Sequence, residues 1–302
     1  MKEVIRLKNV VFTLILLILL ASCTNNSSQI SFSKSDCEKN WALCAVFPNE
    51  KVKLNSPKEP VKVALLDSGV NSSLSFFKNS SIISYDAINN KPTTTDSLGH
   101  GTAIASILLA PANKRTVHGV SPNVKLFDVK VLNDKGGGDI DDVINGIDWS
   151  IKQDVDIINL SFGFQKDDKK LKHAIDKAIE KNIIVIASAG NTLGLSADYP
   201  AKYQNVISVS SVDKNLRRDK FAAKGKVDFV APGVQIPVLT HSGKLETVDG
   251  TSFATAFVTG IVSNILSKNP EYERKDVLNY LKSTAKDLGR KEDYGYGLTQ
   301  YD

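Results

Sequence analysis

From residue 61 onward, short apolar runs alternate with stretches whose apolar residues recur at helical spacing. The runs predict strands over residues 61–66, 124–132, 155–160, 183–187, 206–212 and 227–230. The other stretches predict helices over residues 103–108, 140–152, 171–181, 253–262 and 274–288. Such alternation requires right-handed crossovers and a parallel sheet buried on both faces. We therefore predict an α/β fold: a three-layer, doubly wound, mostly parallel sheet with helices on both faces.

Three polar side chains lie just past the ends of predicted strands. Asp67 follows the first run, Ser161 follows the third, and Asn191 lies shortly after the fourth. The carboxyl ends of parallel strands meet at one edge of a sheet, where functional residues gather. This pattern predicts that the three lie close together. The alternative for Asp67 and Asn191 is that they only close turns.

Two glycine-flanked polar residues stand at predicted helix starts. His100 lies in Gly-His-Gly, and Ser252 follows Gly250 and Thr251 immediately before an apolar run of small residues. At a helix N-terminus, unpaired backbone N–H groups and the helix dipole favour both an attacking oxygen and a developing oxyanion. We predict that Ser252 is a nucleophile. The alternatives are that Ser252 is an N-cap and that His100 is a packed core histidine.

Several motifs in one order resemble those of the subtilisin-like serine proteases. They are DSGV from Asp67, GHGT around His100, INLSFG ending at Gly163, AGN ending at Asn191, APG ending at Gly233, GTSFATA around Ser252 and YGYGL ending at Leu298. The order Asp, His, Ser is that of the subtilisin triad. This order disagrees with a lipase or esterase, whose nucleophile serine precedes the aspartate and the histidine in the sequence. The resemblance spans residues 61–298, and it implies the subtilisin-like fold.

The resemblance also implies a role for each residue. Ser252 would be the nucleophile, His100 its general base and acid, and Asp67 the group that orients His100. Asn191 would donate its side-chain amide to the oxyanion, together with the Ser252 backbone N–H. The segments Gly136–Gly137–Gly138 and Ser161–Phe162–Gly163 would flank an extended peptide substrate and bind its backbone. Phe162 and Phe164 are expected to narrow the substrate groove.

The first residues have the layout of a secretory signal. Lys2, Arg6 and Lys8 precede an apolar run over residues 10–21, which is short for a membrane span. The run ends in Leu20-Ala21-Ser22-Cys23, which resembles a bacterial lipobox, so we predict a lipoprotein signal peptide over residues 1–22 and lipidation of Cys23. The alternative is an incidental cysteine. The predicted location is the extracytoplasmic face of the cell membrane, held by an N-terminal lipid anchor.

Residues 23–59 are predicted to form a tether and an N-terminal extension, followed by the peptidase domain over residues 60–302. The extension is too short for the separately folded prodomain typical of the family. It holds Cys37 and Cys44, which either form a short-loop disulfide or remain two free thiols.

A calcium site known in many relatives is expected to be absent, and no other metal or cofactor is predicted. Calcium prefers several oxygen ligands, usually including carboxylates. Residues Leu74–Phe77, where relatives carry an aspartate, contain no acid, and the loop over residues 113–116 carries Lys114 and Arg115.

We predict a serine endopeptidase that processes a secreted peptide precursor by removing its leader, since short enzymes of this type resemble the leader peptidases of lantibiotics. The alternatives are a general extracytoplasmic scavenging protease and a non-catalytic peptide-binding module. The formal charge of +5 comes from scattered lysines without a basic block, which gives no support for nucleic acid binding. The expected partners are a peptide or protein substrate and the membrane, and the expected state is a monomer.

Overall fold

A seven-stranded parallel sheet runs through the centre of the protein. The computed structural model describes residues 28–302 apart from residues 32–33, 50, 55–58 and 111–117. The strands lie in the order β4-β5-β3-β6-β7-β8-β9, and every ladder between neighbours is parallel. Their bounds are β3 Lys62–Asp67, β4 Ser81–Asp86, β5 Lys125–Lys130, β6 Ile157–Leu160, β7 Ile184–Ser188, β8 Ile207–Val212 and β9 Phe229–Pro232.

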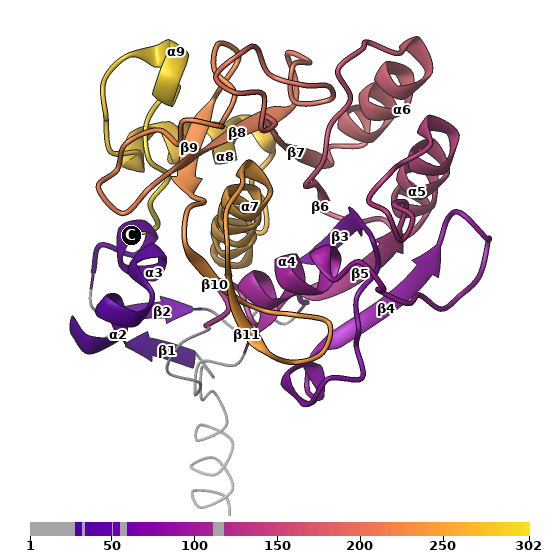
Figure 1. The fold of residues 1–302 in the computed structure, drawn as a ribbon, viewed down its shortest axis with the longest axis horizontal. Helices are drawn as coiled ribbons and strands as arrows, with labels where there is room; N and C mark the ends of the chain where they lie inside the picture. The colour runs from indigo at the N-terminus through magenta and orange to yellow at the C-terminus, as the bar shows by residue number, and fades with distance from the viewer. Residues whose placement is uncertain (1–27, 32–33, 50, 55–58, 111–117) are drawn as a thin grey trace, which may run out of the picture.

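Helices cover both faces of this sheet (Figure 1). One face packs against α4 (His100–Leu109), α7 (Thr251–Lys268) and α8 (Arg274–Thr284), and the other against α5 (Ile140–Lys152) and α6 (Lys169–Glu180). Side chains of β3 alternate between the two cores: Val63 and Leu65 face the first, Ala64 and Leu66 the second. Burial on both faces is why these strands read as continuous apolar runs. The predicted three-layer α/β fold is confirmed.

The strand order reverses beside β3. Strands β4 and β5 lie on one side of it, and β6 to β9 lie on the other. In a doubly wound sheet, ligands bind beyond the carboxyl ends of the strands at such a reversal. Asp67 is the last residue of β3, and Ser161 follows the last residue of β6.

Smaller elements complete the domain. They are the hairpin of β10 (Ile236–Leu239) and β11 (Leu245–Val248), the short helix η1 (Ser75–Phe77) and α9 (Lys291–Tyr294). Helix α8 ends at Thr284, earlier than the predicted residue 288. The helix stops there because Lys286 pairs with Leu298 in an antiparallel bridge, which takes its backbone groups away from helical bonding.

The N-terminal residues form two short helices and a strand pair. Helices α2 (Lys34–Lys39) and α3 (Trp41–Val46) are joined by a disulfide between Cys37 and Cys44, and β1 (Ser28–Ser31) pairs with β2 (Lys51–Leu54). The disulfide is therefore formed, not two free thiols. Leu43 and Val46 are buried in the hydrophobic core, where α3 contacts β9, so the range predicted as tether and extension contributes to the domain interior.

The predicted signal peptide and Cys23 lie outside the described residues. Among the residues that the structure describes, no helix combines the length and the hydropathy needed to span a bilayer.

Candidate active site

Asp67 is buried at the end of β3 and faces His100. Its side chain is 1% exposed, and its Oδ1 accepts hydrogen bonds from the Ser68 backbone N–H at 2.7 Å and from His100 Nδ1 at 2.7 Å. Its Oδ2 is buried without a hydrogen-bond partner among the described residues. With Nδ1 donating to this carboxylate, the other ring nitrogen, Nε2, is left as the acceptor.

His100 is the first residue of α4, held in place by a carboxylate. Asp96 Oδ1 accepts from the Gly99 N–H at 2.7 Å and from Ser68 Oγ at 2.8 Å. Its Oδ2 accepts from the Thr102 N–H at 2.9 Å. Asp96 therefore caps α4 and ties it to the segment after β3. Asp96 was not predicted from the sequence, although an acid shortly before a helix is a common capping signal.

The pKa of His100 is raised above its ordinary value of 6.5. Burial acts in the opposite direction, but the charge of Asp67 and its hydrogen bond outweigh burial, and Asp96 adds to the increase. The carboxylate stabilises the imidazolium, which is the form that His100 takes after removing a proton from a nucleophile.

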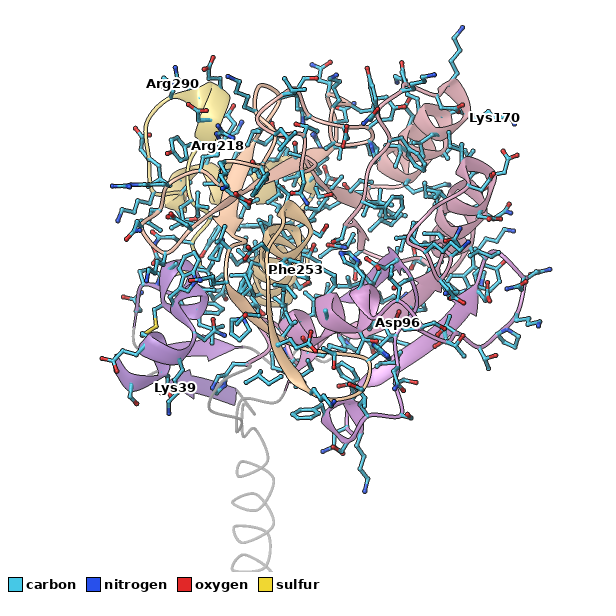
Figure 2. The ribbon with its side chains drawn as sticks, viewed as in Figure 1. Lys39, Asp96, Lys170, Arg218, Phe253 and Arg290 are labelled. Carbon is cyan, nitrogen blue, oxygen red and sulfur yellow. A yellow bond between two sulfur atoms is a disulfide. The ribbon has the colours of Figure 1, made fainter. Side chains whose placement is uncertain are left out.

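Ser252 lies in the first turn of α7, as predicted. Its hydroxyl donates to the backbone carbonyl oxygen of Ser161 at 2.6 Å, and no hydrogen bond joins it to His100. The His100 ring lies next to this turn, with its centroid 5.7 Å from that of Phe253 (Figure 2 labels Phe253 on α7 and Asp96 beside α4). Hydrogen bonds between nucleophile and base are often loose before substrate binds.

Asn191 follows β7 and contacts the same turn of α7. Its Oδ1 accepts from the Thr251 N–H at 3.1 Å and from Thr251 Oγ1 at 3.2 Å. The amide nitrogen Nδ2 lies 3.2 Å from where a Cβ on Gly250 would stand. The Asn191 amide therefore lies against the N-terminus of α7, within two residues of Ser252. The N–H of Ser252 belongs to the first helical turn, whose donors have no partner within the helix.

A buried hydrogen-bond chain links the end of β6 to α7. Thr259 Oγ1 donates to Asn159 Oδ1 at 2.9 Å, and Asn159 Nδ2 donates to Ser161 Oγ at 2.9 Å. Ser161 Oγ in turn donates to the Ser252 carbonyl oxygen at 3.1 Å. This series of hydrogen bonds fixes the predicted substrate-binding segment Ser161–Gly163 relative to Ser252. Thr259 and Asn159 were not predicted, since buried polar pairs have no short sequence signature.

The second predicted substrate segment, Gly136–Gly138, forms a tight turn beyond β5. Leu132 pairs with Gly138, and a Cβ on Gly138 would lie 3.8 Å from the Phe164 ring. Phe162 and Phe164 contact each other edge to face with centroids 6.0 Å apart. The two predicted segments therefore approach each other through Phe164.

The stretch Leu74–Phe77, where we expect no calcium site, includes the short helix η1. Leu74 precedes η1, Phe77 is buried, and no carboxylate lies in this stretch. Within the described part of the chain, no group of three or more His, Cys, Asp or Glu side chains is arranged to hold a metal ion. The loop over residues 113–116 lies outside the described residues. The absence of the calcium site stays a prediction.

Comparisons with known proteins converge on one family. The model of the Subtilase family matches residues 58–297. The chain is 38% identical over 246 residues to subtilisin DY of Bacillus licheniformis, covering 79% of this chain and 88% of that protein. It is 38% identical over 244 residues to subtilisin E of Bacillus subtilis (strain 168), covering 79% of this chain and 64% of that protein.

Solved structures agree with this result. The S41 psychrophilic protease superposes with a TM-score of 0.79 at 26% sequence identity, covering 87% of this chain and 98% of that one. A structure titled Sphericase superposes with a TM-score of 0.78 at 25% identity, with the same coverage.

Proposed function

Since the chain belongs to the subtilase family and is a subtilisin-like serine endopeptidase, we propose that Asp67, His100 and Ser252 are its catalytic triad and that Asn191 completes the oxyanion hole. The observation that carries this proposal is the 2.7 Å hydrogen bond from His100 Nδ1 to the buried Asp67 carboxylate. This bond orients the imidazole beside the helix turn that presents Ser252.

The first half-reaction begins with a rotation of the Ser252 side chain. Its hydroxyl leaves the Ser161 carbonyl and donates to His100 Nε2. As Ser252 Oγ attacks the substrate carbonyl carbon, His100 takes the proton, and the charge of Asp67 stabilises the resulting imidazolium. Asn191 Nδ2 and the Ser252 N–H donate to the oxyanion. His100 then protonates the leaving amine, and the peptide bond breaks to leave an acyl-enzyme.

The second half-reaction uses water as the nucleophile. His100 removes a proton from a water molecule, which attacks the acyl carbon and forms a second tetrahedral oxyanion. The same donors hold this oxyanion. His100 returns the proton to Ser252 Oγ, and the carboxylic acid product leaves.

Hydrolysis of an internally quenched peptide tests the triad. Ser252→Ala is expected to lower kcat by about 10⁶-fold, because the nucleophile is removed. Asn191→Ala is expected to lower kcat by about 100- to 1000-fold with little change in KM, because its donor acts on the transition state. Ser283→Ala on α8 serves as the control. If Ser252→Ala kept native activity, the proposal would be wrong.

We further propose that the enzyme removes the leader from a secreted peptide precursor while anchored through a lipid on Cys23. The lipobox-like residues 20–23 support the anchor. The contact between Phe162 and Phe164 beside the substrate strand supports a narrow substrate range. Mass spectrometry of the membrane fraction should find a diacylglyceryl group on Cys23. The Cys23→Ser variant should be released from the membrane. Finding Cys23 without a lipid in the mature protein would refute the anchor.

The rival proposals are a scavenging protease and a non-catalytic peptide-binding module. Cleavage of unfolded casein distinguishes the first: a dedicated processor should cleave casein far more slowly than a precursor peptide that carries a leader. Equal rates on both would favour scavenging. A binding module would retain peptides without cleaving them.

A further inference from the structure

Asp198 is an acidic residue that the proposed mechanism does not use, and its backbone is fixed between two strand ends. The Asp198 N–H donates to the Ala189 carbonyl oxygen at 2.8 Å, just beyond β7. The next residue, Tyr199, exchanges two backbone hydrogen bonds with Phe164, of 2.7 and 2.8 Å, beyond β6. The segment therefore lies across the two chain segments that leave β6 and β7.

Two glycines make room for the Asp198 side chain. A Cβ on Gly163 would stand 2.7 Å from Asp198 Cβ, and a Cβ on Gly190 would stand 2.4 Å from Asp198 Oδ2. Gly190 also has φ +101°, which disfavours any residue with a Cβ. The carboxylate thus lies against the backbone of Gly190, between the segment with Ser161 and the segment with Asn191.

Both of these segments contact the nucleophile turn. The Gly190 N–H donates to Thr251 Oγ1 at 3.2 Å, and the Ser161 carbonyl accepts from Ser252 Oγ at 2.6 Å. Asp198 therefore lies between two segments that both contact this turn, against Gly163 on one side and Gly190 on the other.

The Asp198 carboxylate has no partner of its own. No described side chain or backbone N–H donates a hydrogen bond to it, and no ion pair of the described residues includes it. The nearby cation, Lys202, binds Ser196 Oγ at 3.2 Å and lies 5.1 Å from the Tyr199 ring centroid. Burial raises the pKa of Asp198, and Lys202 offsets only part of this. An unpaired, half-buried carboxylate favours a cationic ligand.

Building on the proposed function, we propose that Asp198 is a specificity-determining residue that binds the side chain of Lys or Arg on the acyl side of the scissile bond. A lysine ammonium can donate a hydrogen bond to this carboxylate, and an arginine guanidinium can donate two in parallel. The substrates are then peptides cleaved after a basic residue.

Four fluorogenic peptides that differ only at this position, with Arg, Lys, Leu or Phe, test the assignment. The native enzyme should show a kcat/KM at least ten times higher for Arg and Lys than for Leu and Phe. In Asp198→Asn, the ratio of Arg to Leu should fall by about 10- to 100-fold, because a hydrogen bond to a charged group is lost. Asp198→Glu should restore part of the ratio.

Asp176→Asn on α6 is the control, since it removes the same charge from a partly exposed residue that pairs with Lys172 and should leave the ratio unchanged. The thermal midpoint of each variant checks folding. A native preference for Leu or Phe, or an Arg-to-Leu ratio that Asp198→Asn does not change, would overturn the assignment while leaving the protease intact. Failure to cleave any of the four peptides, with no labelling of Ser252 by a fluorophosphonate, would refute the proposed function itself.

Discussion

At the scale of single residues, His100 experiences opposing effects on its pKa, and the outcome predicts a pH profile. Burial lowers the pKa, but the charge of Asp67 raises it above 6.5. Protonated His100 cannot accept the Ser252 proton, so activity is lost as the pH falls through this raised pKa. We expect the acid limb of kcat/KM to have its midpoint above pH 6.5.

Asp67→Asn checks the cause of this midpoint. The variant should move the acid limb to lower pH and reduce kcat by about 10⁴-fold, because the carboxylate no longer orients and stabilises the imidazolium. Asp154→Asn, at an exposed position, should change neither value. A native midpoint below pH 6.5 would mean that Asp67 does not control the charge of His100.

Asp128 on β5 is a second residue with a predicted pH effect. It is 1% exposed, its Oδ2 accepts from Ser84 Oγ at 3.0 Å and from Thr94 Oγ1, and its Oδ1 has no partner among the described residues. Burial raises its pKa from 3.8 to about 7 and outweighs the hydrogen bonds with Thr94, Ser84 and the Val70 backbone, which lower it. The folded state therefore holds a proton that the unfolded state releases between these pH values.

The free energy of unfolding should consequently fall as the pH rises from about 4 to about 7, by on the order of 4 kcal/mol, and this component should be constant above that range. Asp128→Asn should lack this component and be more stable than the native protein at pH 8. Urea unfolding across the pH range measures both, with Asp154→Asn as the control. Parallel pH profiles for the native protein and Asp128→Asn would contradict this account.

At the scale of elements, α3 contributes to the core although the sequence pattern did not predict it. Leu43 and Val46 are buried in the hydrophobic core. Trp41 Nε1 donates to the Val234 carbonyl at 3.2 Å, and the Val46 carbonyl accepts from the Tyr301 N–H at 2.9 Å. The helix thereby joins the N-terminal residues to the segment after β9 and to the end of the chain. The disulfide from Cys37 to Cys44 links α2 to α3.

Leu43→Ala should lower the free energy of unfolding by about 3 kcal/mol, because it removes buried apolar atoms and leaves a cavity. Glu38→Ala on α2 changes an exposed residue and should have little effect. Chemical denaturation of both variants provides the measurement. Equal stability of the two would show that α3 is not part of the core in solution.

The elements also differ in how readily they can be predicted from the sequence. The inner strands β3 and β6 were predictable because burial on both faces selects continuous apolar runs. Strand β4 was missed: it lies at the edge of the sheet, and its side chains alternate between exposed and partly buried. Helix α3 was missed because six residues are too few to show a helical period. In the site, the motif residues were predictable, whereas Asp96 and Asp198 act through contacts that only the folded chain creates.

At the scale of the whole molecule, stability without calcium is an expectation to test. The stretch Leu74–Phe77 offers no carboxylate to a cation, and calcium favours sites with several oxygen ligands. A chelator should therefore leave the thermal midpoint of the protein unchanged, since only ligands that bind the folded state stabilise it. Calorimetry with and without EDTA, followed by addition of calcium, makes the comparison. A midpoint that falls by more than about 5 °C with EDTA and returns with calcium would contradict the expectation.

The whole sheet brings together side chains that are far apart in the chain, and one labelling measurement tests that arrangement most directly. A fluorophosphonate reacts with a serine hydroxyl only when a base removes its proton, so mass spectrometry of the treated native protein should find one adduct, on Ser252. His100→Ala should abolish this adduct while Ser283→Ala retains it. An unlabelled Ser252 in the folded native protein, or equal labelling after His100→Ala, would contradict the account.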